Sequence, residues 1–232
     1  MRIFIAGAAG AIGRQLVPML LERGHEVTGT TRSTERGAWL SEVGATPAIL
    51  DAYDSDAVLA ATRDARPEVV VNQLTDLAAG FGPEDLVSTG RLREVGTRHL
   101  VDAALAVGAR RIVAQSGAWL YADGPTPHDE SQPLRMPTDD PRDASLRGII
   151  ELERLVIGTA GIEGIVLRYG FFYGPNTAWT DQLPSEPRVG IESAARATAL
   201  AIEVGPPGIY NIVDDGGEVS NERARRLLGW SP

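Results

Sequence analysis

Short apolar runs alternate with amphipathic stretches along most of this chain. The apolar runs, bounded by turn-forming residues, predict strands at Ile3–Ala6, Glu26–Thr31, Pro47–Leu50, Glu68–Asn72, Arg110–Gln115 and Gly164–Leu167. The segments between them have the spacing of helices, at Ala11–Arg23, Thr34–Val43, Ser55–Asp64, Glu84–Val107 and Asp143–Thr159. Regular alternation of strand and helix predicts an α/β fold with a doubly wound parallel sheet.

The first strand runs directly into a glycine-rich turn. In Gly7-Ala8-Ala9-Gly10-Ala11-Ile12-Gly13 the glycines recur every third residue, and a predicted helix follows. Gly7 permits a tight turn, Gly10 permits the backbone to approach a pyrophosphate, and Gly13 permits close packing of helix on strand. The helix N-terminus attracts the anion. This context predicts a dinucleotide site that includes Ala11 and Ile12; the alternative is a plain tight turn.

Composition narrows the function classes. The 232 residues carry a net charge of -9, and the sequence pI is about 4.9. Nucleic acids and anionic membranes both favour a clustered positive surface, so we expect neither as a partner. The absence of cysteine excludes disulfides and thiolate chemistry. We find no signal peptide or membrane span in the sequence and expect a cytoplasmic protein.

The basic residues carry further information, because all 22 are arginine and none is lysine. Mechanisms that need a Schiff base or a lysine proton shuttle are therefore excluded. The histidines are His25, His99 and His128, and their spacing predicts no metal site. Of these, we expect only His128 to reach a substrate.

Further motifs accompany the glycine turn. They are Leu50-Asp51-Ala52-Tyr53-Asp54, the helix segment Val95–Ala104, the pair Gln115-Ser116, the stretch Leu167–Pro175 and the closing segment Ser220–Trp230. Together they resemble the short-chain dehydrogenase/reductase superfamily, on its extended branch, the NAD-dependent epimerase/dehydratase family. The resemblance spans nearly the whole chain and implies a Rossmann-like fold, a nicotinamide dinucleotide cofactor and a small-molecule substrate. It also implies a possible homodimer formed through Glu84–Val107 and Asp143–Thr159.

The C-terminal part of the chain is shorter than this resemblance implies. Residues 1–175 are expected to form the dinucleotide-binding core, and residues 176–232 to add short substrate-region elements on the same domain. Those elements are a helix at Ile191–Val204, a strand at Ile209–Val213 and a helix at Asn221–Leu228. Because this region is compressed, we expect a pocket that is shallow, open or completed by another subunit. Its candidate lining residues are Trp119, Phe171, Phe172 and Trp179.

The residues at the end of the second predicted strand indicate whether the site prefers NAD(H) or NADP(H). An NAD-preferring site usually has a carboxylate there, whereas this chain has Thr30, Thr31, Arg32 and Ser33. Arg32 suits the 2′-phosphate of NADP(H), with Ser33 beside it, so we predict NADP(H) rather than NAD(H). The alternative is a solvated surface arginine.

The resemblance assigns two further pairs of residues to the cofactor. Asp51 and Ala52 match the adenine contact, although Asp51 could instead cap the helix beginning near Asp54. Tyr169 and Gly170 would flank the nicotinamide ribose.

The catalytic motif of the resembled family is missing. That motif combines a serine or threonine with a tyrosine and, four residues later, a lysine that lowers the pKa of the tyrosine. When Glu153 is matched to the family's glutamate, the tyrosine position falls on Ser145 and the lysine position on Ile149. No tyrosine occurs between Gly124 and Thr159 to restore the motif.

Two hydroxyls remain as catalytic candidates. Ser116, at the end of the fifth predicted strand, is the first choice for a donor to a substrate carbonyl; alternatively it satisfies backbone groups at the strand end. Tyr121 could replace the missing tyrosine, but it also matches a family tyrosine whose ring packs beneath the loop.

Three functions fit these observations. The first and preferred one is an NADPH-dependent reductase of a carbonyl or activated double bond in a small metabolite. The second is a non-redox isomerase, cyclase or dehydratase of secondary metabolism, and the third is a dinucleotide-sensing regulatory protein. The missing motif favours the second and third, whereas the glycine turn and Arg32 favour the first two.

Overall fold

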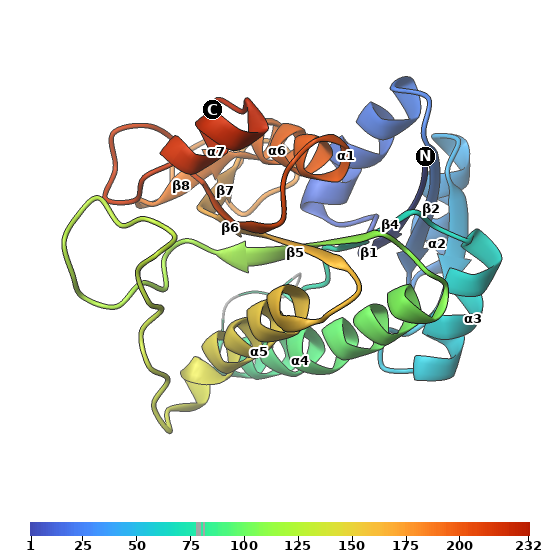
Figure 1. Cartoon of the computed structure of the whole chain (residues 1–232), viewed down its shortest axis with the longest axis horizontal. Coiled ribbons are helices and arrows are strands. Elements are labelled where there is room, and N and C mark those ends of the chain that lie inside the picture. Colours follow the sequence, from blue (N-terminus) through green and yellow to red (C-terminus); the bar gives the residue numbers. More distant parts are fainter. Residues whose placement is uncertain (78–79, 81) are drawn as a thin grey trace.

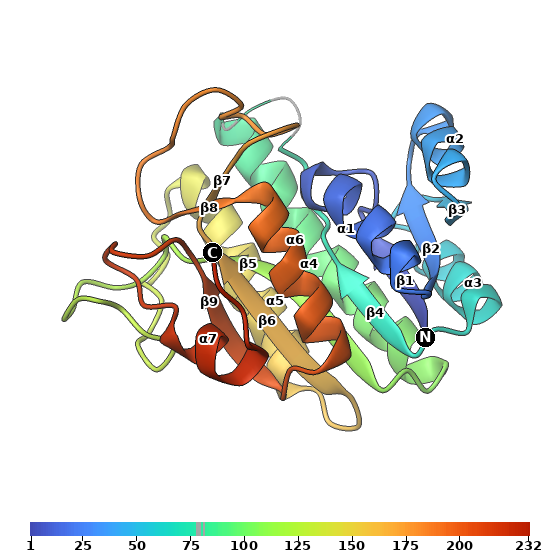
Figure 2. The ribbon, with the colours of Figure 1, turned by 90° about the horizontal axis from the view of Figure 1, so that it is seen from above.

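The computed structural model describes residues 1–77, 80 and 82–232, which form one seven-stranded parallel sheet between two helical layers (Figures 1 and 2). The strand order is β3-β2-β1-β4-β5-β6-β9. The strands are β1 (Arg2–Ala6), β2 (Glu26–Thr31), β3 (Thr46–Ile49), β4 (Val69–Asn72), β5 (Arg111–Gly117), β6 (Glu163–Tyr169) and β9 (Gly208–Ile212). The expected doubly wound α/β fold is therefore confirmed.

The helices divide between the two faces of the sheet. One face is covered by α1 (Ala11–Glu22), α6 (Ile191–Glu203) and the short α7 (Glu222–Leu228). The other carries α3 (Ser55–Ala65), α4 (Pro83–Ala106) and α5 (Ala144–Gly158), and α2 (Thr34–Glu42) packs beside the edge strands β2 and β3 (Figure 1). None of the helices in the described part of the chain is both long and apolar enough to cross a membrane.

Burial explains why the central strands are so apolar. All four residues of β4 are buried, and alternate side chains enter different cores: Val69 and Val71 face α1 and α6, whereas Val70 faces α4 and α5. A strand covered on both faces has no solvent side. It therefore reads as a continuous hydrophobic run, which makes it easy to detect in a sequence.

The predicted elements agree with the structure to within two residues at their ends. Two short strands were not predicted, β7 (Phe171–Tyr173) and β8 (Arg188–Gly190), which pair in parallel as a separate sheet. A 3-10 turn at Pro141–Asp143 was not predicted either. The partners β7 and β8 lie far apart in sequence and each is very short, so neither carries a periodic pattern. From the C-terminal residues, β9 joins the main sheet beside β6, and α6 packs on α1.

Candidate cofactor and substrate site

The glycine turn lies where the strand order reverses. β1 has β2 on one side and β4 on the other, so the connections after these strands diverge and leave a crevice at their carboxyl ends. Gly7 sits there with φ +81°, and its N–H donates to Thr30 Oγ1 at 3.3 Å. Gly10 is the N-cap of α1 and has no capping side chain, which leaves the first N–H groups of the helix open to an anion.

Each glycine of the turn meets a different constraint. A Cβ on Gly13 would lie 2.0 Å from the Ala8 carbonyl oxygen, and one on Gly7 would lie 2.7 Å from the Gln73 carbonyl oxygen. These two positions are fixed by packing within the protein. A Cβ on Gly10, in contrast, would meet only the Gly7 carbonyl oxygen, at 3.3 Å, and would otherwise project into open space. The fold itself therefore constrains position 10 much less than positions 7 and 13, because only the Gly7 carbonyl would have to shift, whereas close approach of a phosphate requires glycine there.

This difference gives a test of the turn. Gly10→Ala is expected to weaken dinucleotide binding at least about tenfold, or ~1.4 kcal/mol, with little change in the melting temperature. Calorimetric titration measures the first and thermal unfolding the second. Gly158→Ala is the matched control, because a Cβ there meets nothing within 4 Å. Equal cofactor affinity in the two variants would contradict a phosphate at this turn.

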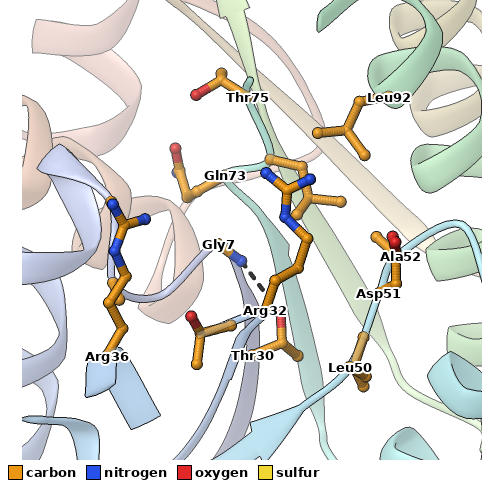
Figure 3. A pocket seen from close by; sticks show the side chains of 14 residues that line it. Gly7, Thr30, Arg32, Arg36, Leu50, Asp51, Ala52, Gln73, Thr75 and Leu92 are labelled. Carbon is orange, nitrogen blue, oxygen red and sulfur yellow. Dashed lines mark hydrogen bonds between the residues drawn. The ribbon is translucent and has the colours of Figure 1, made fainter. Parts of the chain in front are cut away.

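A pocket opens beside the glycine turn, between the ends of β2, β3 and β4 (Figure 3). Its lining residues are Gly7, Ala9, Gly10, Thr30, Thr31, Arg32, Arg36, Leu50, Asp51, Ala52, Gln73, Leu74, Thr75 and Leu92. The structure thus brings together the predicted residues Gly7, Gly10, Arg32, Asp51 and Ala52.

Gln73 is a pocket residue that sequence reasoning missed. It follows β4 and is 6% exposed. Among the residues that the structure describes, neither its Oε1 nor its Nε2 has a hydrogen-bond partner of adequate geometry, although the Tyr169 hydroxyl lies beside it. A buried amide without partners is costly unless a ligand satisfies it. This orphaned group, inside a pocket next to the glycine turn, fits a bound dinucleotide. The only sequence signal was an amide directly after a buried apolar run.

Two arginines flank the pocket at the end of β2. Arg32 and Arg36 both line the pocket, and their side chains extend in roughly the same direction in Figure 3; Arg36 was not predicted. Arg32 Nη2 donates to Asp76 Oδ1 at 2.9 Å, and its side chain remains 59% exposed. Hydrogen bonds from Ser88 and Arg32 hold the pKa of Asp76 below its usual range. Ser33 caps α2 by accepting from the Arg36 N–H.

Asp51 lines the pocket rather than capping a helix. Its Oδ1 accepts from the Tyr53 N–H at 3.0 Å, and the N-cap of α3 is Asp54, which accepts from Asp56 and Ala57. The idea that Asp51 caps this helix is therefore wrong. An adenine contact by Asp51 stays a prediction.

Ser116 lies inside the protein. The residue is fully buried, and its hydroxyl donates to Glu153 Oε1 at 2.6 Å. Glu153 also accepts from Arg168, through Nε at 2.9 Å and Nη2 at 2.7 Å. The hydroxyl thus satisfies a side chain of α5 and not the strand-end backbone. With its hydrogen given to Glu153, a role for Ser116 as donor to a carbonyl stays a prediction.

Tyr121 is likewise engaged. Its hydroxyl donates to Asn211 Oδ1 at 2.7 Å, and its ring stacks on His128 with centroids 5.1 Å apart. The Arg168 guanidinium lies 5.1 Å from the same ring centroid. Desolvation raises the pKa of Tyr121, which opposes ionisation. The ring is thus packed between His128 and Arg168, and both the packing role implied by the resemblance and a catalytic role stay predictions.

Tyr169 contacts α6, and Gly170 packs against β8. Tyr169 is fully buried, shares a hydrogen bond of 2.7 Å with Thr198 Oγ1, and has a pKa raised by burial. A Cβ on Gly170 would lie 2.6 Å from the Arg188 backbone. Contact of these two residues with the nicotinamide ribose stays a prediction.

A second cavity, of about 490 Å³, lies between the N-terminal ends of α4 and α5 and the loop after β5. Its lining residues are Leu86, Trp119, Leu120, Arg135, Thr138, Asp140, Arg142, Asp143, Ser145 and Leu146. Trp119 stacks on Phe171 at 4.5 Å between centroids, and Phe171 contacts Trp179 at 5.7 Å. Of the four predicted aromatic residues, Trp119 lines this cavity. The volume lies within the range of small-molecule sites.

Comparison with known proteins agrees with this geometry. Residues 3–204 match the sequence profile of the NAD dependent epimerase/dehydratase family. The chain belongs to this family. It is 41% identical to a 3-diazoavenalumate denitrifying reductase of Streptomyces sp, over 93% of this chain and 76% of that protein. It is 28% identical to a dTDP-4-dehydrorhamnose reductase of Streptomyces griseus, over 100% of this chain and 77% of that protein.

Solved structures of similar shape show the fold of this epimerase/dehydratase-family protein. The UDP-glucose 4-epimerase of Thermotoga maritima, solved with UDP-glucose, has a TM-score of 0.80 at 18% identity and covers 100% of this chain and 94% of its own. The UDP-glucose 4-epimerase of Thermus thermophilus, solved with NAD, has a TM-score of 0.74 at 24% identity, with coverage of 100% and 85%. Relatives named as reductases and epimerases make this chain an enzyme of oxidoreductase or epimerase type that binds a nicotinamide dinucleotide.

Helix α5 contains the residues that were matched to the resembled motif. If Glu153 is matched to the family's glutamate, the tyrosine position falls on Ser145 and the lysine position on Ile149, which is fully buried in an apolar cluster with Leu120 and Leu146. An apolar side chain there can neither bind the cofactor through a charge nor lower the pKa of a neighbour. Of the two matched positions, only Ser145 therefore has a polar side chain.

Proposed function

We propose that this epimerase/dehydratase-family enzyme is an NADPH-dependent reductase whose substrate accepts a hydride without a proton from a tyrosine. The observation that carries the proposal is the state of the hydroxyls. Ser116 donates to Glu153 and Tyr121 donates to Asn211, and the match on Glu153 assigns the motif positions to Ser145 and Ile149. A substrate that is already strongly electrophilic removes the need for a general acid.

The two arginines at the end of β2 support NADPH. Arg32 and Arg36 supply a double positive charge beside the pocket, and guanidinium groups bind phosphate through paired hydrogen bonds. Asp76 neutralises part of the charge on Arg32. Arg36 adds a second guanidinium that could bind the 2′-phosphate.

The reductase of 41% identity suggests the substrate class, because its name describes removal of a diazo group by reduction. We propose an aryl diazonium compound. When bound, the reduced nicotinamide supplies a hydride whose electron pair forms the new C–H bond, while the C–N bond breaks and its electron pair leaves with N₂. The products are the arene, N₂ and NADP⁺, and no proton is consumed. The protein's part is to orient the ring, for which Trp119 offers a flat wall.

The test uses NADPH carrying deuterium at the transferred position. With a carboxylated benzenediazonium salt, we expect NADPH oxidation in step with loss of the diazo group, and one deuterium at the former diazo carbon by mass spectrometry. The control is the same mixture without enzyme, because diazonium salts decompose spontaneously. Arene formed at the control rate, or enzymatic product without deuterium, would contradict the proposal.

A further inference from the structure

Arg93, on α4, differs from the other buried arginines of the described chain. Arg111 and Arg168 pair with Glu163 and Glu153, respectively. Arg93 is 2% exposed, has no carboxylate partner among the described residues, and its Nε makes no hydrogen bond. Burying an unpaired cation is expensive, so such a residue indicates a missing anion.

Within the described part of the chain, the one hydrogen-bond partner of the Arg93 guanidinium is a hydroxyl. Arg93 Nη1 donates to Ser145 Oγ at 2.5 Å. The contact is set by a close crossing of α4 and α5, because a Cβ on Gly90 would lie 2.2 Å from the Ala144 carbonyl oxygen, and one on Gly148 would lie 2.3 Å from the Gly90 carbonyl oxygen. Two small residues therefore bring the helices together and place Arg93 directly behind Ser145.

Ser145 links this buried cation to the second cavity, which it lines. Because its oxygen accepts from Arg93, the hydrogen of its hydroxyl is free to donate to another group. Burial lowers the pKa of Arg93 to about 10, so the guanidinium still carries its charge at neutral pH. The result is a hydroxyl donor, backed by a positive charge, in the wall of a cavity that also contains Trp119.

The other charges of the cavity cancel. Arg135 pairs with Asp143, and Arg142 pairs with Asp140, each through a direct ion pair. The uncompensated charge is that of Arg93. An occupant of this cavity should therefore present a negative oxygen to Ser145 and an apolar, flat surface to Trp119, Leu120 and Leu146.

We propose that Ser145 and Arg93 form an anionic-oxygen subsite for an aromatic substrate. Ser145 donates its hydroxyl hydrogen to a carboxylate or phenolate oxygen, and Arg93, a positioning residue, holds Ser145 and supplies the charge. The subsite rests on the proposed function, since that function makes the second cavity the substrate site. It also explains Ser145 at the tyrosine position: the hydroxyl is kept, and its cation comes from α4 instead of the next turn of α5.

The experiment compares two unreactive probes, cinnamate and its neutral amide, cinnamamide, by calorimetric titration of the whole protein without cofactor. Both share the ring and the chain and differ in charge. Wild-type protein is expected to bind cinnamate at least about tenfold more tightly. The absence of this preference would overturn the proposal without any variant.

Variants locate the preference. Ser145→Ala and Arg93→Met are expected to reduce cinnamate affinity about tenfold or more and to leave cinnamamide affinity within about twofold. Arg154→Ala is the control, because Arg154 is an exposed residue on α5, the helix that carries Ser145. This variant should change the affinity of neither probe. A purely structural role of Arg93 would weaken both probes equally. If Arg93→Met does not fold, Ser145→Ala decides, and a retained preference for cinnamate in that variant overturns the proposal.

A parallel titration with NADPH separates this inference from the proposed function. Binding of NADPH and turnover of a diazonium substrate, without a preference for cinnamate, would leave the reductase proposal standing and the subsite wrong. A charge-dependent cinnamate site without NADPH binding or turnover would support the subsite as a binding site and contradict the reductase.

Discussion

Replacing Glu153 by leucine is expected to destabilise the protein by about 3–5 kcal/mol, the usual effect of removing one partner from a buried ion pair. Arg168 is 4% exposed, and its Nε and Nη2 both donate to this carboxylate, while Nη1 already has no partner in the described ranges of the chain. Without Glu153, the guanidinium and the Ser116 hydroxyl lose their acceptor in a site closed to water. Urea unfolding of the variant and the wild type measures the difference in free energy.

Two further variants sharpen this experiment. Glu151→Gln lies on the same helix but breaks only the exposed pairs with Arg98 and Arg154, so we expect less than about 1 kcal/mol. The double variant Glu153→Leu with Arg168→Met removes both charges and should recover much of the lost stability. If Glu153→Leu unfolds at the same urea concentration as Glu151→Gln, the pair is not a main support of the β5–β6 region.

The double substitution Arg32→Ala with Arg36→Ala is expected to reduce NADPH affinity about 100-fold, or ~2.7 kcal/mol, and NADH affinity less than about threefold. Charge-assisted hydrogen bonds to a phosphate explain the size of this effect, and only NADPH carries the 2′-phosphate. Titration calorimetry with each cofactor measures both values.

Two single variants test whether the loss of NADPH affinity comes from these arginines. Asp76→Asn should raise NADPH affinity severalfold, because it releases Arg32 from its ion pair. Arg63→Ala, on the exposed side of α3, is the control and should change neither cofactor. Equal losses of NADPH and NADH in the double variant would contradict recognition of a 2′-phosphate and leave the family's dinucleotide site without the proposed preference.

Much of the fold was predictable because its signals are local. The buried run Val69–Asn72 and the glycine spacing from Gly7 to Gly13 each occupy a few consecutive residues, and both are where expected. The paired strands Phe171–Tyr173 and Arg188–Gly190 were missed because each exists only through the other. Arg36 and Gln73 were missed because an ordinary helical arginine and an amide after a strand carry no motif.

The sequence by itself determined the fold class, the glycine turn, the family and the absence of lysine, since each depends on which residue types occur and on their local spacing. Only the tertiary structure decided how the hydroxyls are used. In the folded chain, Ser116 donates a hydrogen bond to Glu153, Tyr121 donates to Asn211, and Arg93 donates to Ser145. Those partners are 37, 90 and 52 residues apart. Their meeting depends on the register of β5 and β6 and on the close crossing of α4 and α5, which no local pattern records.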